Sequence, residues 1–259
     1  MRNFKLILQY EGTRYQGWQR QISTPNTIQG RLEALLTKMV NTKTEIHGSG
    51  RTDAGVHALG QCANFHAVTD MSCAEICAYM NRYLPEDIGV ISVEEVPERF
   101  HSRLNAVGKT YQYRVLNTEI PHVFDRRYVY VFPAALDLEA MTEAAGYLVG
   151  THDFRAFTSA KKGKKSTVRT IEDIHIARVN DEIRFTYSGD GFLFHMIRIV
   201  TGTLLEAGTG ERKPADIETI MDRGVREDAG KLVPARGLTL MEVRYNDRSF
   251  YEKKGKWKR

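Results

Sequence analysis

A glycine-rich loop, from residue 47 to residue 61, constrains the fold of this chain more than any other segment. Its sequence, HGSGRTDAGVHALGQ, places glycine at positions 48, 50, 55 and 60. Glycine reaches positive φ angles and lets the backbone approach a ligand closely, although each glycine loses extra conformational entropy on folding. This density of glycine around Arg51 and Asp53 therefore predicts a tight loop that presents a charged pair at a functional site.

A surface turn and a phosphate-binding loop are the alternatives for this segment. Arg and Asp neighbours in a turn are commonly a solvated pair of little energetic consequence. The Gly-Lys-Ser/Thr ending of a P-loop is absent, and the glycine spacing does not fit a dinucleotide-binding motif. The loop alone predicts a site without naming its chemistry.

Length and composition indicate a globular protein with a substantial core. The chain has 259 residues, of which 42% are hydrophobic and 27% are charged. It contains no apolar run of about 18 residues, so we expect no membrane-spanning helix. The N-terminal segment is too short and too mixed for a secretory signal, and we expect a cytoplasmic protein.

The three cysteines do not suggest a disulfide framework, because their number is odd. Cys73 and Cys77 stand four positions apart near His66, which resembles part of a zinc site. A structural zinc ion takes four ligands, and a fourth is not evident. We therefore expect reduced thiols and no metal or other cofactor.

Positive charge is concentrated in two segments. The formal net charge is +5, and residues 248–259 alone carry six basic side chains and one acidic side chain, so the rest of the chain is neutral. The second cluster is internal and comprises Lys161, Lys162, Lys164, Lys165 and Arg169. Such clusters are commonly solvated, and polyanion binding is the functional alternative. Two clusters on a neutral body favour a nucleic-acid partner, and we take the four lysines as candidate RNA-binding residues.

The hydrophobic periodicity predicts a similar succession of elements in two halves of the chain. The expected strands are 3–10, 45–49, 61–66, 90–96, 111–115, 128–132, 168–179, 183–187 and 239–245. The expected helices are 27–40, 72–83, 138–148, 192–207 and 215–222. Thr27 is predicted to cap the first helix, and Ser72 with Glu75 is predicted to form a capping box on the second.

Each half mixes helices with antiparallel strand pairs, which predicts an α+β fold with two related halves. The loop around residues 100–108 is the expected boundary. We assign residues 1–104 to an N-terminal α+β domain that carries the glycine-rich loop, 105–247 to a C-terminal α+β domain, and 248–259 to a basic tail.

A series of motifs along the chain resembles those of the tRNA pseudouridine synthase A family. The motifs are YEGT and GWQ within 10–19, TIQ at 27–29, the loop itself, FHSR and KTYQYR within 100–114, HDF at 152–154, GFLFHMIR at 191–198, and ARGL at 235–238. They occur in order from Tyr10 to about Tyr245, and the catalytic loop shows no departure from the family pattern. The resemblance implies the pseudouridine synthase fold, in which two mainly antiparallel halves flank a central RNA-binding cleft.

The resemblance also implies a function, the isomerisation of uridine to pseudouridine at tRNA positions 38, 39 and 40 in the anticodon stem-loop. It makes Asp53 the catalytic nucleophile, Arg198 its ion-pair partner and Tyr111 the substrate-binding aromatic residue, with Arg51 as a further catalytic candidate. Members of the family are homodimers that bind tRNA without a cofactor, and we expect the same here. A non-catalytic RNA-binding protein of the same fold is the alternative.

The chemistry of these residue types agrees with such a reaction. The N1–C1′ bond must break, the base must turn, and a C5–C1′ bond must form; a carboxylate can take part by forming a covalent intermediate. The residues leave open whether Asp53 attacks the sugar, attacks the base or accepts a proton. A nearby cation favours the ionised carboxylate, and an aromatic ring can stack on the detached base. From periodicity alone, Tyr111 could equally be a core residue.

Three histidines and one tryptophan have no assigned role from the sequence. His47 and His57 flank the loop, and we favour structural or RNA-contacting roles over general-base catalysis for both. His195 lies in an apolar segment, where we expect it to be packed or hydrogen-bonded. Trp18 could stack on RNA or pack in the core.

Overall fold

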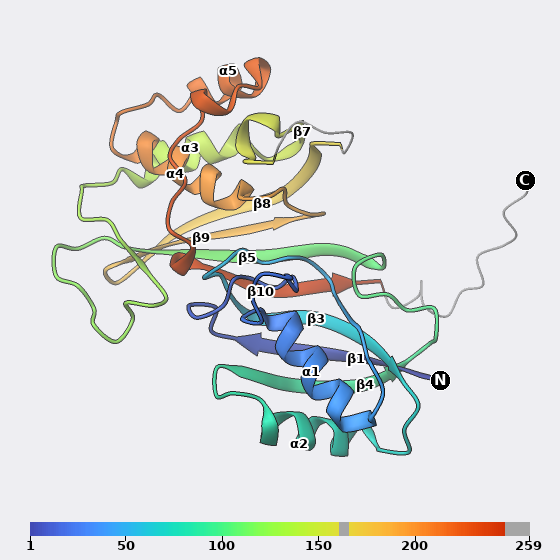
Figure 1. The fold of residues 1–259 in the computed structure, drawn as a ribbon. Helices are drawn as coiled ribbons and strands as arrows, with labels where there is room; N and C mark the ends of the chain where they lie inside the picture. The colour runs from blue at the N-terminus through green and yellow to red at the C-terminus, as the bar shows by residue number, and fades with distance from the viewer. Residues whose placement is uncertain (161–165, 247–259) are drawn as a thin grey trace, which may run out of the picture.

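One ten-stranded sheet extends through the structure, a computed structural model that describes residues 1–160 and 166–246 (Figure 1). Its main path has the order β4-β1-β3-β10-β5-β9-β8-β7, with β2 attached to β3 and β6 attached to β5. The strands are β1 (Arg2–Tyr10), β2 (Ile46–Gly48), β3 (His57–Ala67), β4 (Ile88–Val96), β5 (Ala106–Leu116), β6 (Tyr130–Val131), β7 (Gly150–Asp153), β8 (Val168–Val179), β9 (Glu182–Gly189) and β10 (Leu238–Tyr245).

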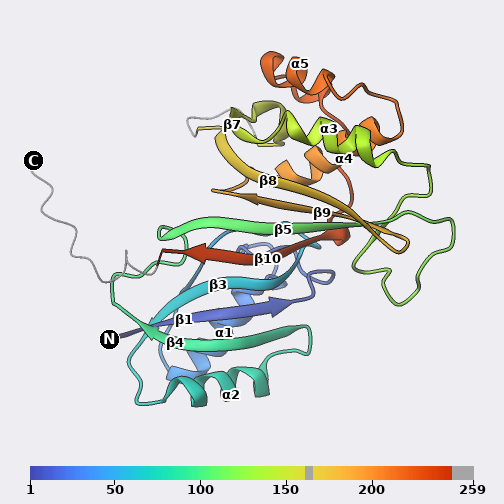
Figure 2. The ribbon, with the colours of Figure 1, turned by 180° about the vertical axis from the view of Figure 1, so that it is seen from behind.

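Five α-helices accompany the sheet within the described residues, and the expectation of an α+β fold is confirmed. They are α1 (Ile28–Val40), α2 (Cys73–Tyr83), α3 (Leu138–Gly146), α4 (Met196–Gly208) and α5 (Asp216–Arg223). Figures 1 and 2 show α1 and α2 beside the β4-β1-β3 half of the sheet and α3, α4 and α5 beside the β9-β8-β7 half. The candidate RNA-binding residues Lys161, Lys162, Lys164 and Lys165 and the basic tail 248–259 lie outside the described residues.

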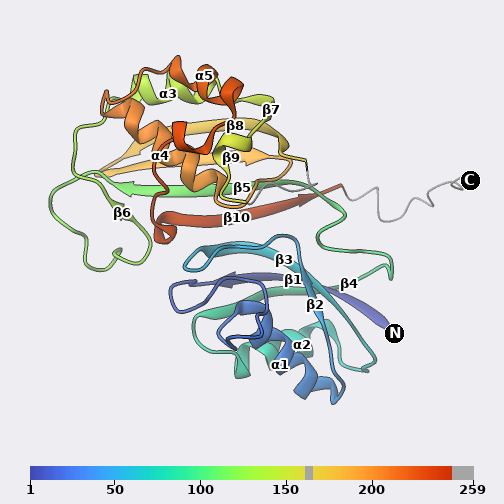
Figure 3. The ribbon, with the colours of Figure 1, turned by 45° about the horizontal axis from the view of Figure 1, so that its top comes forward.

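Strand β10 joins the two halves of the sheet, although it is the last strand of the chain. It pairs in parallel with β3 and antiparallel with β5, and Figure 3 shows it between them. Leu240 is the partner of Ala58 on one side and of Tyr111 on the other. This register places Tyr111 two strands from the start of β3, about 10 Å away at the usual spacing of strands. The end of the glycine-rich loop and Tyr111 therefore face the same part of the molecule.

The helix starts predicted for α1 and α2 are confirmed. The Thr27 side chain accepts a hydrogen bond from the Gly30 amide, and Ser72 and Glu75 form the reciprocal bonds of a capping box. These caps satisfy amide groups that have no partner inside the helix.

The start predicted for the long fourth helix, residue 192, is wrong. Helix α4 begins at Met196, because His195 has φ 65° and ψ 1°, the left-handed region. The apolar residues 192–194 continue the helical pattern in the sequence, but they form a loop that lines the same cleft as the glycine-rich loop. Among the described residues, no helix is long and apolar enough to cross a membrane.

Candidate active site

The segment between β1 and α1 holds the glycine-rich loop in place. Trp18 donates its backbone N–H to the Thr52 carbonyl at 3.0 Å, and the Tyr10 hydroxyl lies 2.8 Å from the Thr52 side-chain oxygen. Gly17, with φ 84°, makes this approach possible, since a Cβ at this position would stand 2.6 Å from the Thr52 carbonyl oxygen. These contacts fix the backbone on both sides of Thr52 and so aim the next residue, Asp53, into the cleft.

Asp53 and Arg198 meet in the structure, as the sequence predicted. Arg198 Nη1 donates to Asp53 Oδ2 at 3.3 Å, and both side chains are largely buried, with exposed fractions of 12% and 17%. Arg198 Nε donates to the Val233 carbonyl at 2.8 Å, which fixes the plane of the guanidinium group. A guanidinium with two fixed hydrogen bonds is a rigid cation beside the carboxylate.

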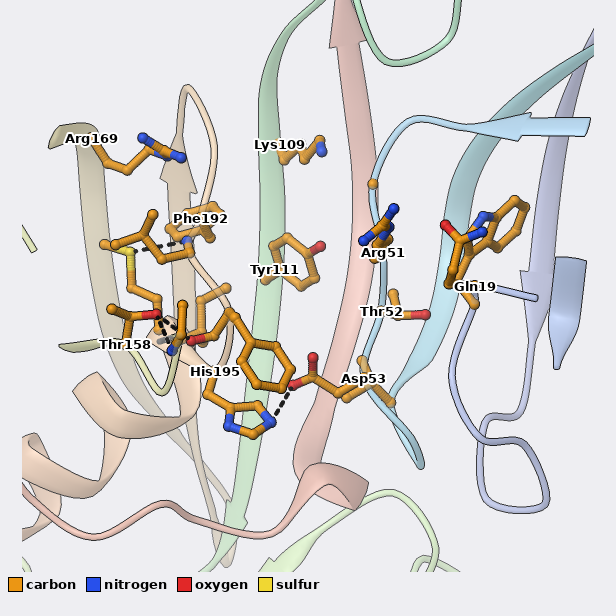
Figure 4. A pocket seen from close by; sticks show the side chains of 18 of the residues that line it. Gln19, Arg51, Thr52, Asp53, Lys109, Tyr111, Thr158, Arg169, Phe192 and His195 are labelled. Carbon is orange, nitrogen blue, oxygen red and sulfur yellow. Dashed lines mark hydrogen bonds and ion pairs between the residues drawn. The ribbon is translucent and has the colours of Figure 1, made fainter. Parts of the chain in front are cut away.

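His195 is also beside Asp53, a contact that the sequence did not predict. Its Nε2 lies 3.6 Å from Asp53 Oδ2, and Figure 4 shows both side chains pointing toward each other in the pocket. Burial lowers the pKa of His195 below its ordinary value; Asp53 opposes this shift, whereas Arg198 and Arg226 add to it. The neutral imidazole is therefore favoured. The apolar residues around His195 in the sequence gave no signal of this contact.

Tyr111 is buried yet lines the same pocket as Asp53 (Figure 4). Its ring meets that of Phe192 edge to face, with centroids 5.5 Å apart. Burial raises the pKa of the Tyr111 hydroxyl, and Tyr10 and Asp53 add to this shift, so the phenol stays protonated at neutral pH. Arg51 also lines the pocket, and it is exposed.

The pocket is a large cleft of about 2130 Å³ between the two halves of the sheet. Its cationic lining residues, within the described part of the chain, are Arg51, Arg103, Lys109, Arg155, Arg169 and Arg226. Its carboxylates are Asp53, Asp153 and Glu227, and Asp153 is already paired with Arg155. The described wall is therefore positively charged and suited to a polyanion.

Lys109 is the most unusual of these cations. Its Nζ donates to the Ser49 carbonyl at 2.9 Å, and the residues described here give it no carboxylate partner. Burial lowers its pKa to about 8, with Arg103 and Arg169 contributing in the same direction. An anion bound in the cleft would restore the full charge of this lysine.

His57, His47 and Trp18 lie in three different environments. His57 is buried: its Nδ1 accepts the Gly12 N–H at 3.0 Å, and its Nε2 lies 2.9 Å from the Arg127 carbonyl oxygen. His47 lines the cleft, where its ring stacks with that of His101 at a centroid distance of 4.9 Å. Trp18 is only 2% exposed and belongs to the core, which resolves the alternative left open by the sequence.

In the part of the chain that the structure describes, no group of three or more His, Cys, Asp or Glu side chains is placed to bind a metal ion. The thiol of Cys77 lies 3.6 Å from the Val90 carbonyl oxygen, and Cys62, Cys73 and Cys77 are all free.

Comparison with known proteins identifies the family to which the chain is similar. The family model described as tRNA pseudouridine synthase matches residues 6–105 and 144–246. A protein from Bacillus sp. (strain KSM-64) named tRNA pseudouridine synthase A is 46% identical over 245 residues, which cover 95% of this chain and 100% of that protein. A relative from Clostridium tetani, named tRNA pseudouridine synthase A 2, is 45% identical over 95% of this chain and 99% of its own length.

The chain belongs to the tRNA pseudouridine synthase family. Asp53, His195 and Arg198 all lie within the residues that the family model matches, whereas Tyr111 lies in the segment between the two matched ranges. The two matched ranges meet in space at the cleft, because the loop of the first faces the start of α4 in the second.

Proposed function

We propose that this protein isomerises uridine to pseudouridine in tRNA, at positions 38, 39 and 40 of the anticodon stem-loop, with Asp53 as the nucleophile. The observation that carries the proposal is the largely buried Asp53–Arg198 pair, whose carboxylate lines a cationic cleft. Membership of the family and the names of the relatives support the substrate class.

The geometry around Asp53 suits attack on the sugar. Arg198 and His195 both face Oδ2, and no described residue donates a hydrogen bond to Oδ1. Oδ1 is therefore free to bond to C1′ as the N1–C1′ bond breaks. Arg198 holds the carboxylate in a fixed orientation during this step and stabilises it again when it leaves.

Tyr111 is placed to hold the uracil after it detaches from the ribose. A stacking surface permits rotation of the base while preventing its escape, and its phenol stays neutral beside the carboxylate. Arg51 lines the cleft and is exposed, so its guanidinium group is suited to contact the RNA beside Asp53. Isomerisation involves no net oxidation, and we propose that it needs no metal or organic cofactor.

The four lysines of 161–165 are proposed to contact the tRNA backbone. The residues on either side of this segment, Ala160 and Ser166, both line the cleft. Arg155 and Arg169 belong to the same lining of the cleft as Ala160 and Ser166. Two further proposals, a homodimer and a cytoplasmic location, rest on the resemblance to the family and on the tRNA substrate.

Incubating the purified protein with an unmodified tRNA transcript and mapping pseudouridine at nucleotide resolution tests the function. Pseudouridine at positions 38–40 is the expected result, without added cofactor. Tight binding with no modification would instead indicate a non-catalytic RNA-binding protein. Sedimentation of the free protein tests the homodimer in a separate experiment.

A further inference from the structure

His195 is held in a strained backbone conformation. Its φ of 65° is rare for a residue with a side chain, and its side chain does not cap the helix that follows. Strained residues of this kind persist when the surrounding structure enforces them, and they concentrate at functional sites. With this backbone conformation at the start of α4, the imidazole of His195 points toward Asp53 (Figure 4).

Both imidazole nitrogens of His195 also lack a hydrogen bond within the described structure. Nδ1 is buried without a partner, and Nε2 is 3.6 Å from Asp53 Oδ2, beyond hydrogen-bond distance. A buried polar atom without a partner destabilises the folded protein. Neither nitrogen is therefore committed to a hydrogen bond within the described structure, and Nε2 is the one that faces the site of reaction beside Asp53.

The charged groups that face His195 come from three elements. Asp53 faces it from the glycine-rich loop, Arg198 from α4, and Arg226 from the short 3-10 helix Arg226–Asp228. The side chain is 18% exposed, and its ring stacks on that of Phe194 at a centroid distance of 3.7 Å. An imidazole held neutral by burial and two guanidinium groups is able to accept a proton, and the adjacent carboxylate stabilises the imidazolium that results.

Isomerisation of uridine needs such a proton carrier. When C5 bonds to C1′, it still carries its hydrogen, and that proton must leave while N1 gains one. Tyr111 is a poor acceptor because its buried phenol stays protonated. Asp53 is bonded to C1′ until the new bond forms, and the carboxylate released then pairs again with Arg198. His195 is the remaining titratable group beside Asp53 among the described residues.

We propose that His195 carries the proton from C5 to N1 in the last stage of the reaction, an inference that rests on the proposed function. The C5–C1′ bond forms and Asp53 leaves C1′ as a carboxylate. The C5–H bond then breaks: the proton goes to Nε2 of His195, and its electron pair restores the C5–C6 double bond, leaving the negative charge on N1. Imidazolium next protonates N1, which returns neutral His195 and balances the isomerisation without a further reactant.

Single-turnover rates on tRNA transcripts with protium or deuterium at C5 of uridine test this role. His195→Asn removes the base but retains a residue that tolerates a left-handed backbone. We expect its rate to fall about 100- to 10,000-fold, the usual contribution of general acid–base catalysis, with unchanged tRNA affinity. We also expect a primary isotope effect clearly larger than that of the wild type, because removal of the C5 proton becomes rate-limiting.

Chemical rescue separates this role from a structural one. His195→Gly suits the positive φ and leaves a cavity, so added imidazole should restore turnover, and more basic imidazoles should restore it more. His122→Asn, at a histidine outside the cleft, is the matched control and should leave the isotope effect as in the wild type. A wild-type rate in His195→Asn overturns the proposal, as does a slow variant with an unchanged isotope effect and no rescue. Failure of the wild type to form pseudouridine would refute the proposed function itself.

Discussion

Arg198 donates to Asp53 at 3.3 Å although 145 positions separate the two residues in the chain. Asp53 follows β2 in the first half of the chain, and Arg198 lies in the first turn of α4, after β9. Strand β10 lies between these halves in the sheet, and the Val233 carbonyl just before it anchors Arg198. The active site is therefore complete only when β10 has paired with both β3 and β5.

Asp53→Asn should abolish isomerisation while leaving the fold and tRNA affinity intact. The amide has nearly the same shape as the carboxylate, but it is neither ionised nor nucleophilic. Pseudouridine mapping measures activity, and filter binding measures affinity. Asp173→Asn, at an exposed acid on β8, is the matched control and should retain activity. Wild-type turnover by the Asp53 variant would remove this residue from the mechanism.

Arg198→Lys should lower kcat roughly 10- to 100-fold, the kinetic equivalent of losing a charge-assisted hydrogen bond of about 1.5–3 kcal/mol. A lysine keeps the charge, but it does not reproduce a planar group that bonds Val233 and Asp53 at once. Single-turnover kinetics at saturating tRNA give the measurement. Arg212→Lys alters an arginine–carboxylate pair with Glu206 that does not line the cleft, and serves as the control. Equal losses in both variants would argue against a specific role.

Local sequence signals predicted many of the elements but not their assembly. The caps at Thr27 and Ser72 were predictable because a cap depends on residues three or four positions apart. The place of β10 between β3 and β5 was not, since it depends on pairing between strands more than a hundred residues apart. The start of α4 was placed too early, because nothing in an apolar sequence reveals the left-handed backbone of His195.

The residues of the active site also fall into two groups, those that the sequence predicted and those that it did not. Asp53 and Arg198 were found because their motifs resemble those of a known family, and the ion pair between them is confirmed. His195 was dismissed because an apolar neighbourhood usually means packing, and its contact with Asp53 depends on backbone strain. Arg103, Arg155 and Arg226 are scattered in sequence, so only folding gathers them at the cleft wall.

The stability of the protein should fall as the pH drops below about 6.5, in part through His57. Burial lowers the pKa of His57 below its unfolded value, opposed by its bond to the Arg127 carbonyl and by Glu11. Between the folded and unfolded pKa values, the unfolded state binds more protons, so its contribution to stability is present above pH 6.5 and is lost below it. Protonation of Nδ1 would also break the bond from Gly12.

Urea unfolding of the wild type and of His57→Asn between pH 5 and pH 8 measures this dependence. Asn keeps an acceptor near the position of Nδ1 but does not titrate, so the free energy of unfolding should vary less with pH than in the wild type. His175→Asn, at an exposed histidine on β8, should leave the pH dependence unchanged. An identical profile for the His57 variant and the wild type would assign the acid sensitivity to other groups.

Gly48→Ala should destabilise the protein by about 1–3 kcal/mol, the usual effect of adding a methyl group to a packed core. A Cβ at this position would stand 2.4 Å from the Trp18 ring, which is 2% exposed and has no room to retreat. Thermal unfolding gives the measurement. Gly146→Ala, where a Cβ would meet nothing within 4 Å, is the matched control and should be neutral or slightly stabilising. Equal stability of the two variants would show that Trp18 can move.

Replacing Lys161, Lys162, Lys164 and Lys165 together with alanine should weaken tRNA binding and flatten its dependence on salt. Each phosphate neutralised by a protein cation contributes about 0.7–0.9 to the slope of log K against log salt. Removing contacts to the backbone therefore reduces the slope, while the chemical step at saturating tRNA should stay nearly unchanged because Asp53 is untouched. Titrations at several salt concentrations give the slope directly.

A matched quadruple variant of the C-terminal tail, with Lys253, Lys254, Lys256 and Lys258 changed to alanine, removes the same charge from a different part of the chain. The internal lysines should have the larger effect, because Ala160 and Ser166 on either side of them line the cleft. If the internal variant keeps the wild-type slope, these lysines are solvated and make no phosphate contact. The described cations of the cleft wall, Arg51, Lys109 and Arg169 among them, would then supply the phosphate contacts.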